Sequence, residues 1–208
     1  MTLRMVLATH NGHKVAELRR ILGGLDVELL DASGVGLPEV EETGETFADN
    51  ARIKARESAA HSRLPCLADD SGLTVEALGG EPGVRSARYA GEPKDDRRNV
   101  QLLLERTEDI DDRRAAFICV AALAMPDGRD WLTVGELHGT IASAPSGTGG
   151  FGYDPVFVPE GHTRTLAELD DEEKDAISHR GLAFRAMLPA IEALSGADSD
   201  PWPDSLSI

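Results

Sequence analysis

The order of segments in the first 30 residues constrains the fold more than any other feature of the chain. Residues 3–8 are aliphatic and β-branched, which predicts a strand, and the polar residues 9–12 end it. Apolar side chains then recur at helical spacing across 14–22, and a Gly-Gly pair ends this helix before a second predicted strand at 27–30. A strand, a tight loop and a helix in this order are typical of an α/β fold.

Further elements of both kinds follow along the chain. The turn sequence Pro126-Asp127-Gly128 separates two predicted strands, which should therefore pair antiparallel. Ser178 is expected to cap the last helix, and Pro189 to kink or weaken it because proline removes a backbone donor. The predicted helices lie from about 46 to 59 and at 94–106 and 177–194, and the predicted strands at 64–68, 115–124, 131–138 and 155–158.

The sequence predicts a single domain. It has no internal repeat and no linker between two cores, so we interpret residues 1–195 as a single domain. Residues 196–208 have no hydrophobic periodicity, which predicts a mobile C-terminal tail. The two cysteines, Cys66 and Cys119, lie in apolar runs and are expected to be buried free thiols.

The charge of the chain excludes several classes of partner. With 21 Lys and Arg against 37 Asp and Glu, the formal net charge is −16. Nucleic acid polymers and anionic membranes attract proteins through Lys and Arg, so we expect neither as a partner. The longest apolar stretch, 115–126, is too short to span a membrane, and the N-terminus lacks a signal-peptide pattern. We therefore expect a cytoplasmic protein.

A first candidate site is the loop 9–14, Thr-His-Asn-Gly-His-Lys, between the first strand and the first helix. A helix N-terminus offers free amides and a positive dipole end, and a lysine there adds a charge for phosphate. The loop does not match the phosphate-loop pattern G-x-x-x-x-G-K-[ST]. An ordinary connection with a capping Asn11 therefore remains an equal alternative.

Two acidic clusters, 41–45 and 69–72, are candidates for metal binding and acid–base chemistry. Magnesium prefers carboxylate oxygens and is often held by one or two of them against substrate phosphates. A neighbouring carboxylate can also take a proton from attacking water. The alternatives are a solvated acidic loop for the first cluster and an Asx-type turn at a strand end for the second.

The remaining candidates lie in the C-terminal third. Residues 147–155 satisfy G-x-G-x-x-G, but no strand precedes them and no helix follows, which argues against a dinucleotide fingerprint. The loop could instead present its aromatic side chains and Asp154 to a nucleobase, or Phe151 could simply enter the core. Lys174 lies in an acidic run where a surface salt bridge is the simpler explanation. His179 and Arg180 begin the last helix, where cations are unfavourable, which points to a ligand.

Taken together, these clusters run in one order. The chain contains T-x-N-x-x-K, E-E-T-G-x-T-F-x-x-N-A-x-x-K-A, A-D-D-S-G-L, G-x-x-S-A-R-Y-A-G, G-T-G-G-F-G-Y-D-P and S-H-R-G. Over residues 9–194 this order resembles the non-canonical purine nucleoside triphosphate pyrophosphatase family, also called inosine triphosphate pyrophosphatases. The resemblance implies an α/β fold in which a long mixed β-sheet is flanked by helices, with a substrate cleft between two lobes, and a homodimer. It also implies magnesium-dependent hydrolysis of ITP, dITP and XTP to the monophosphate and pyrophosphate.

The resemblance also implies residue roles. Glu41 and Asp70 would hold Mg²⁺, and Asp70 would accept the proton of a metal-bound water that attacks the α-phosphorus. Phe151 would stack on the base, with Asp154 accepting from N1–H and His179 or Arg180 donating to O6. Asp69 would be a supporting residue. The implied substrate-binding residues are Thr9, His10, Asn11, Gly12, His13, Lys14, Lys54, Ser71, Phe151, Gly152, Tyr153, Asp154, Lys174, His179 and Arg180.

Two other functions stay open on the sequence. One is a pyrophosphatase that prefers another nucleotide, such as a canonical or modified pyrimidine triphosphate. The other is a nucleotide-binding regulatory protein without turnover, although the intact acidic clusters and Lys14 argue against it.

Overall fold

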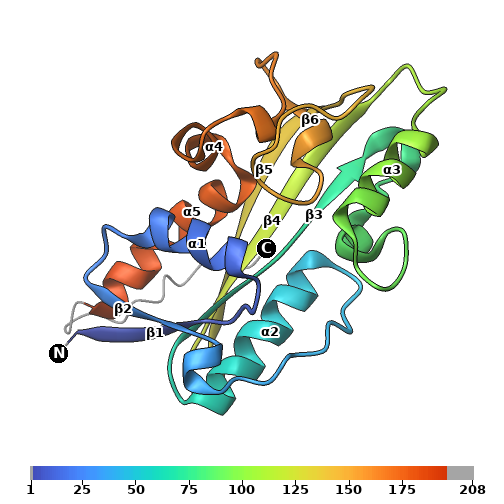
Figure 1. Cartoon of the computed structure of the whole chain (residues 1–208). Coiled ribbons are helices and arrows are strands. Elements are labelled where there is room, and N and C mark those ends of the chain that lie inside the picture. The colour runs from blue at the N-terminus through green and yellow to red at the C-terminus, as the bar shows by residue number, and fades with distance from the viewer. Residues whose placement is uncertain (1, 196–208) are drawn as a thin grey trace.

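The computed structural model describes residues 2–195, which build a six-stranded sheet with helices on both faces (Figure 1). The strand order is β2-β1-β3-β4-β5-β6. Strand β1 runs parallel to β2 and β3, whereas β3, β4, β5 and β6 are successively antiparallel, so the sheet is mixed. The strands are β1 Leu3–Leu7, β2 Val27–Asp31, β3 Cys66–Val75, β4 Arg114–Ala124, β5 Asp130–Ile141 and β6 Phe157–Pro159.

Five α-helices complete the described fold, and local capping signals explain where several of them begin. The Asn11 side chain accepts from two amides at the start of α1, and Thr46 does so for one amide of α2. Ser178 accepts from the Gly181 amide and caps α5, as predicted, and α5 continues past Pro189. The helices are α1 Gly12–Leu22, α2 Phe47–Ser62, α3 Asp96–Arg106, α4 Asp171–Ile177 and α5 His179–Ser195.

One helix was missed by the sequence analysis. Helix α4 forms from the acidic run before Ser178, where only a salt-bridged surface segment was expected. Its start carries a capping box, because Asp170 accepts from the Glu173 amide while the Glu173 side chain accepts from the Asp170 amide. This reciprocal cap stabilises a short helix that has little apolar periodicity.

Alternation along the central strands distributes their side chains to two faces. On one face, Leu67 of β3 packs with Phe184 and Met187 of α5 and with Leu18 of α1. On the other face, the neighbouring Ala68 packs against alanines of α2. Because successive strand residues point to opposite sides, α2 and the α1–α5 pair cover opposite faces (Figure 1).

The long strands β3, β4 and β5 extend beyond these helices and carry a further core cluster. Leu73, Phe117 and Ile141 pack there with Leu103 of α3 and Phe157 of β6. The described chain therefore has two lobes on one sheet, with β1, β2, α1, α2 and α5 at one end and α3 and β6 at the other (Figure 1). The fold class implied by the sequence motifs is confirmed.

The largest correction concerns β3. The sequence predicts a strand at 64–68 followed by a polar turn at 69–72, but β3 continues without interruption to Val75. Its whole length pairs with the apolar strand β4, and Asp69 and Asp70 lie opposite Ala121 and Val120. Pairing with β1 ends at Leu67, so the acidic residues lie where β3 leaves its parallel neighbour.

Other predictions are confirmed, differ slightly from the structure, or concern residues that the structure does not describe. The antiparallel pairing of β4 and β5 is confirmed, with β5 reaching Ile141 rather than 138. Cys66 and Cys119 are buried free thiols, and burial raises their pKa to about 11 and about 12. None of the described helices is long and apolar enough to cross a membrane. The predicted tail 196–208 lies outside the described residues.

Candidate active site

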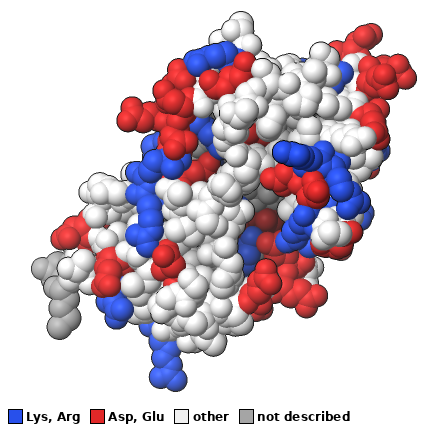
Figure 2. All heavy atoms as spheres, in the orientation of Figure 1, with Lys and Arg blue, Asp and Glu red and all other residues white. Residues whose placement is uncertain are grey.

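A cavity of about 790 Å³ opens between the two lobes. Figure 2 shows the hollow in the molecular surface, with both acidic and basic side chains on its walls. Every residue assigned a site role from the sequence lines this cavity except Gly12, which lies at the first position of α1. The walls come from the β1–α1 loop, residues 37–42, α2, the centre of β3, residues 84–96, residues 147–155 (the glycine loop), Lys174 of α4 and the start of α5.

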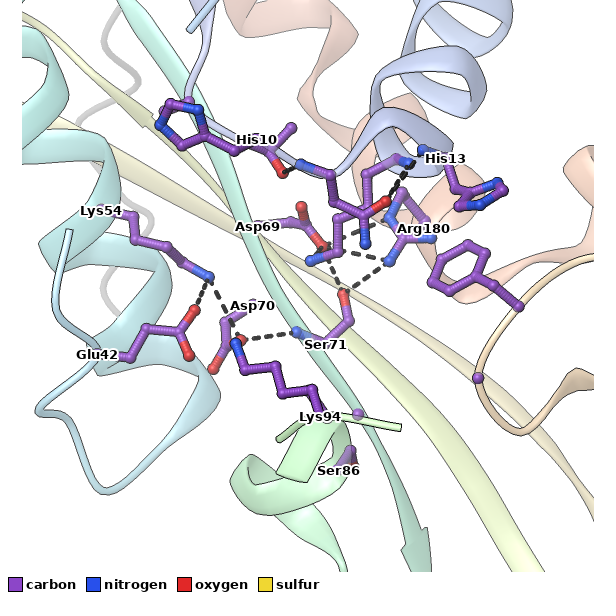
Figure 3. Close-up of a pocket in the computed structure, with 18 of the residues that line it drawn as sticks. His10, His13, Glu42, Lys54, Asp69, Asp70, Ser71, Ser86, Lys94 and Arg180 are labelled. Atoms are coloured by element: carbon purple, nitrogen blue, oxygen red, sulfur yellow. Dashed lines mark hydrogen bonds and ion pairs between the residues drawn. The ribbon is translucent and has the colours of Figure 1, made fainter. Parts of the chain in front are cut away.

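The β1–α1 loop forms a capped helix start that faces β3. Asn11 Oδ1 accepts from the His13 and Lys14 amides at 3.0 and 3.3 Å, so Asn11 caps α1. Lys14 nevertheless turns its ammonium group into the cavity, where Nζ lies 2.9 Å from Asp69 Oδ2. The exposed His10 lies on the Lys54 side of this loop and His13 on the Arg180 side (Figure 3).

Asp69 is a buried carboxylate held by cations. Its Oδ2 accepts from Lys14, from the Ser71 hydroxyl at 2.7 Å and from Arg180 at 3.4 Å (Figure 3). Burial acts to raise the pKa of Asp69, but the nearby charges of Lys14 and Arg180 outweigh it and hold the pKa far below its usual range. Asp69 is therefore a permanent anion that anchors cations from two helices.

Asp70 faces the opposite side of β3 and has the opposite character. Its carboxylate accepts from Asn50 of α2 at 3.1 Å. It also lies 3.4 Å from Lys54 Nζ (Figure 3). Burial is the main cause that raises the pKa of Asp70; Lys54 lowers it in part, and the charge of Glu42 raises it further. A carboxylate with a raised pKa is a better proton acceptor than an ordinary one.

The acidic loop before α2 reaches the same region. Glu42 binds Lys54 at 2.8 Å, whereas Glu41 is exposed on the cavity wall and has no hydrogen bond or ion pair within residues 2–195. No group of three or more potential metal-ligating side chains was found in the described part of the chain. Magnesium commonly uses only one or two carboxylates and completes its shell with water and phosphate. Glu41 and Asp70 fit that donor set.

Lys174 and Arg180 are buried and share a partner. Glu17 of α1 binds the Lys174 ammonium at 2.8 Å and also pairs with the Arg180 guanidinium. Lys174 further binds Asp154 at 2.8 Å. At 5% exposure Lys174 is not a surface residue, so the surface salt-bridge alternative is wrong.

Phe151 forms an aromatic wall beside these cations. Its ring is stacked on His13 with centroids 5.5 Å apart. The Lys174 ammonium lies 5.1 Å and the Arg180 guanidinium 5.7 Å from the ring centroid. Phe151 is half-buried and lines the cavity, so it does not enter the core as the alternative proposed.

Tyr153 and Asp154 are more deeply buried than Phe151. Tyr153 is buried in the core and donates its hydroxyl hydrogen to the Ser86 carbonyl at 2.9 Å. Asp154 is 3% exposed, and its Oδ2 accepts both from Lys174 and from the Phe151 amide. Burial raises the pKa of Asp154 while Lys174 lowers it in part.

His179 begins α5 as a neutral side chain, although the sequence suggested a cation at this position. Its ring is stacked on Phe117 with centroids 4.7 Å apart, and it is fully enclosed at 5% exposure. Burial and the charges of Arg180 and Lys174 lower the pKa of His179 well below 6.5. Its Nδ1 is buried and finds no partner among the described residues.

Sequence analysis missed several residues that organise this site. Glu17 lies on an amphipathic helix, where a glutamate is normally read as solvated, and its partners are 157 and 163 residues away. Asn50 donates to Asp70 and accepts from the Gly44 amide; a polar residue inside the alanine stripe of α2 was the available signal. Ser86 belongs to the motif G-x-x-S-A-R-Y-A-G but was assigned no role, and Phe117 gave no signal because it is an ordinary apolar residue of a buried strand.

Comparison with known proteins identifies the family of the chain. The model of the Ham1 family matches residues 5–190. The dITP/XTP pyrophosphatase of Streptomyces coelicolor is 54% identical over 198 residues, covering 93% of this chain and 99% of that protein. The dITP/XTP pyrophosphatase of Mycobacteroides abscessus is 50% identical and covers 92% and 96%.

Solved structures of similar proteins share the fold of this chain. A HAM1 protein from Coxiella burnetii superposes with a TM-score of 0.85 at 45% identity, covering 91% of this chain and 98% of that one. The Staphylococcus aureus Ham1 protein has a TM-score of 0.83 at 38% identity, covering 92% and 99%. Because the family model and these relatives span nearly the whole sequence, the chain belongs to the Ham1 family.

Proposed function

We propose that this protein hydrolyses the non-canonical purine nucleoside triphosphates ITP, dITP and XTP to the monophosphate and pyrophosphate. The observation that carries the proposal is the convergence of residues from separate sequence motifs on one cavity of about 790 Å³. The relatives named dITP/XTP pyrophosphatase, about half identical over nearly the full length, support the choice of substrate.

The triphosphate would lie between the β1–α1 loop and Lys54. Lys14 lines the cavity next to the N-terminus of α1, and that end of a helix attracts anions. Lys54 adds a second cation from α2. These two lysines offset part of the acidic charge of the cavity in a protein whose overall charge is −16, and with a bound magnesium ion they would favour a small anion over a polymer.

Glu41 and Asp70 would hold Mg²⁺ in this proposal. The unpaired, exposed Glu41 carboxylate and the nearby Asp70 supply hard oxygen donors on one cavity. The ion, when bound, would neutralise phosphate charge and favour departure of pyrophosphate. Lys54 already lies beside Asp70, so the site accommodates positive charge at this point.

Asp70 is the proposed proton acceptor. A water molecule attacks the α-phosphorus, a P–O bond to water forms, and the bond to the bridging oxygen of pyrophosphate breaks. The proton of the attacking water moves to the Asp70 carboxylate, whose pKa is raised by burial. Asn50 holds one carboxylate oxygen in place at 3.1 Å, which orients the group for this transfer.

The base would stack on Phe151, and the polar groups beside it would read its edge. A 6-keto purine offers an acceptor at O6 and a donor at N1. Arg180 or His179 can donate to O6, while Asp154 Oδ1, which has no hydrogen bond within residues 2–195, can accept from N1–H. Adenine reverses both groups and would leave buried polar atoms unpaired.

The resemblance further supports a cytoplasmic homodimer, which we include in the proposal. Light scattering of the purified full chain tests the assembly. A mass of twice 22.2 kDa is expected, and a monomeric mass at micromolar concentration would contradict this part of the proposal.

The deciding experiment measures pyrophosphate release from ITP, dITP, XTP, ATP, GTP and pyrimidine triphosphates, with magnesium and with chelator. We expect release from ITP, dITP and XTP but not from ATP or the pyrimidine triphosphates, and only with magnesium. Guanine has the same O6 and N1–H groups as hypoxanthine, so the contacts described above do not distinguish GTP from ITP. Equal rates with ATP and ITP would overturn the selectivity, and full activity in chelator would overturn the metal requirement. Preferred release from a pyrimidine triphosphate, or binding without release from any, would replace the proposal with one of the two alternatives.

A further inference from the structure

The glycine loop separates two cavities. A second cavity of about 620 Å³ lies between α3 and residues 145–155. Asp96, Phe151 and Gly152 line both this cavity and the candidate active site. Residues 151 and 152 are therefore the wall between two hollow spaces.

Two consecutive backbone amides hold this wall. The Phe151 amide donates to Asp154 Oδ2 at 2.9 Å, and that carboxylate is buried and bound by Lys174. The next amide, that of Gly152, donates to Asp96 Oδ2 at 2.8 Å. Gly152 has a φ of +61°, a conformation that glycine adopts without strain, so the two amides can point to different acceptors.

The two acceptors differ in kind. Asp154 belongs to the loop itself and lies in a rigid, buried network. Asp96 is exposed and comes from the first position of α3, 56 residues before Gly152 in the chain. In the described chain, it makes the only hydrogen bond between α3 and the loop 144–156. The wall thus depends on one exposed hydrogen bond on its α3 side.

The position of the Phe151 ring depends on this backbone. The ring lies against His13 on one side and near the Lys174 and Arg180 cations. These neighbours limit where the ring can stand, but the second cavity leaves room for the backbone to withdraw toward α3. A contact that fixes the Gly152 amide also limits that withdrawal.

We propose that Asp96 is a positioning residue: its carboxylate holds the Gly152 amide and thereby keeps the Phe151 ring in place for the nucleobase. The inference rests on the proposed function, in which the base stacks on Phe151. Without the carboxylate, the loop samples more conformations, and the substrate must order it on binding. Such a loss weakens substrate binding and leaves the phosphate chemistry at Asp70 intact.

The chain offers a matched control for this test. Asp95, the neighbouring residue, has the same charge and caps α3 by accepting from the Arg98 amide at 3.0 Å, but it has no hydrogen bond to the loop among the described residues. Asp95→Ala removes a carboxylate and weakens the start of α3. Asp96→Ala removes the loop contact. Asp96→Asn keeps an acceptor oxygen, and Asp96→Ser is a second variant that is too short to reach the loop.

The first measurement is amide hydrogen exchange of the Gly152 region in the full-length protein without substrate. We expect exchange to rise about two- to tenfold in Asp96→Ala and Asp96→Ser, as for loss of one hydrogen bond, and to stay near the wild-type rate in Asp96→Asn and Asp95→Ala. Unchanged exchange in both shortened variants, or an equal rise in Asp95→Ala, would overturn the contact. This readout is independent of whether the protein hydrolyses ITP.

The second measurement is steady-state pyrophosphate release from ITP. Asp96→Ala is expected to raise KM about two- to tenfold with kcat nearly unchanged, and Asp96→Asn to restore the wild-type KM. A fall in kcat at constant KM, or the same KM increase in Asp95→Ala, would overturn the positioning role. Absence of turnover in the wild-type protein would instead contradict the proposed function, and the exchange data would still decide the contact.

Discussion

Removing the charge of Glu17 is the sharpest test of how the site is held together. Glu17 is 5% exposed and binds both Lys174 and Arg180, whose side chains are 6% and 3% exposed. Its pKa is lowered, because the two cations outweigh the opposing effect of burial. Glu17→Gln keeps the size of the side chain and removes the shared anion between two buried cations.

The expected loss follows from burial. Breaking a buried ion pair by removing one partner costs about 3–5 kcal/mol, because the other charge stays in a poorly solvated place. For a chain of 208 residues, each kcal/mol lowers Tm by about 2–4 °C, so the shift should be about 6–20 °C. Asp69 and Asp154 remain beside the two cations, which favours the lower part of this range.

Urea unfolding followed by circular dichroism measures the loss, with Glu28→Gln as the control. Glu28 pairs with Arg4 at 3.0 Å, but both side chains are more than half exposed. An exposed pair of this kind contributes about 0–1 kcal/mol. A loss below about 1 kcal/mol for Glu17→Gln, similar to that of the control, would refute the conclusion that burial makes this pair important.

Further predictions concern catalysis, pH and a helix cap. Asp70→Asn should reduce pyrophosphate release by at least about 100-fold with an unchanged circular dichroism spectrum, and near-normal kcat would exclude Asp70 as the proton acceptor. His179 has a folded pKa well below its ordinary 6.5, so the stability it contributes is complete above that pH and is lost as the pH falls toward the folded pKa. Urea unfolding from pH 7.5 to 5 should show a smaller loss in His179→Gln, and equal slopes would contradict this. Thr46→Ala should cost about 1 kcal/mol through loss of the α2 cap, measured against the exposed Thr43→Ala, and an equal effect of the two would count against the cap.

The parts of the fold that could be predicted are those decided by residues close together in sequence, such as helix caps and turns. Asn11 and Ser178 were placed correctly because a helix cap is decided within a few residues. The hairpin of β4 and β5 followed from two apolar runs and one turn. The extent of β3 was not predictable in this way, because its acidic centre becomes strand only through pairing with β4, about 50 residues later.

In the candidate site too, sequence motifs were recognisable, whereas contacts between residues distant in sequence were not. Ordered motifs led to the residues that line the cavity, although their roles stay predictions. Glu17 could not be found, since nothing near it in sequence reveals that Lys174 and Arg180 will bury it. Asp96 could not be predicted from the sequence either. An exposed aspartate at the start of a helix is common, and only the folded chain brings it to Gly152.

The uninterrupted course of β3 has a genetic consequence. Asp69 and Asp70 are neighbours in sequence, yet one is a fixed anion among cations and the other has a raised pKa beside α2. Their roles are set by whether each position is odd or even along the strand. Insertion of a single codon between Leu67 and Asp69 would turn each carboxylate to the opposite face of the sheet, while two inserted codons would restore the faces but move both carboxylates two positions along β3, away from Lys14 and Asn50. A conservative substitution at an apolar position of β3 should thus be tolerated more readily than an insertion or deletion before Asp69.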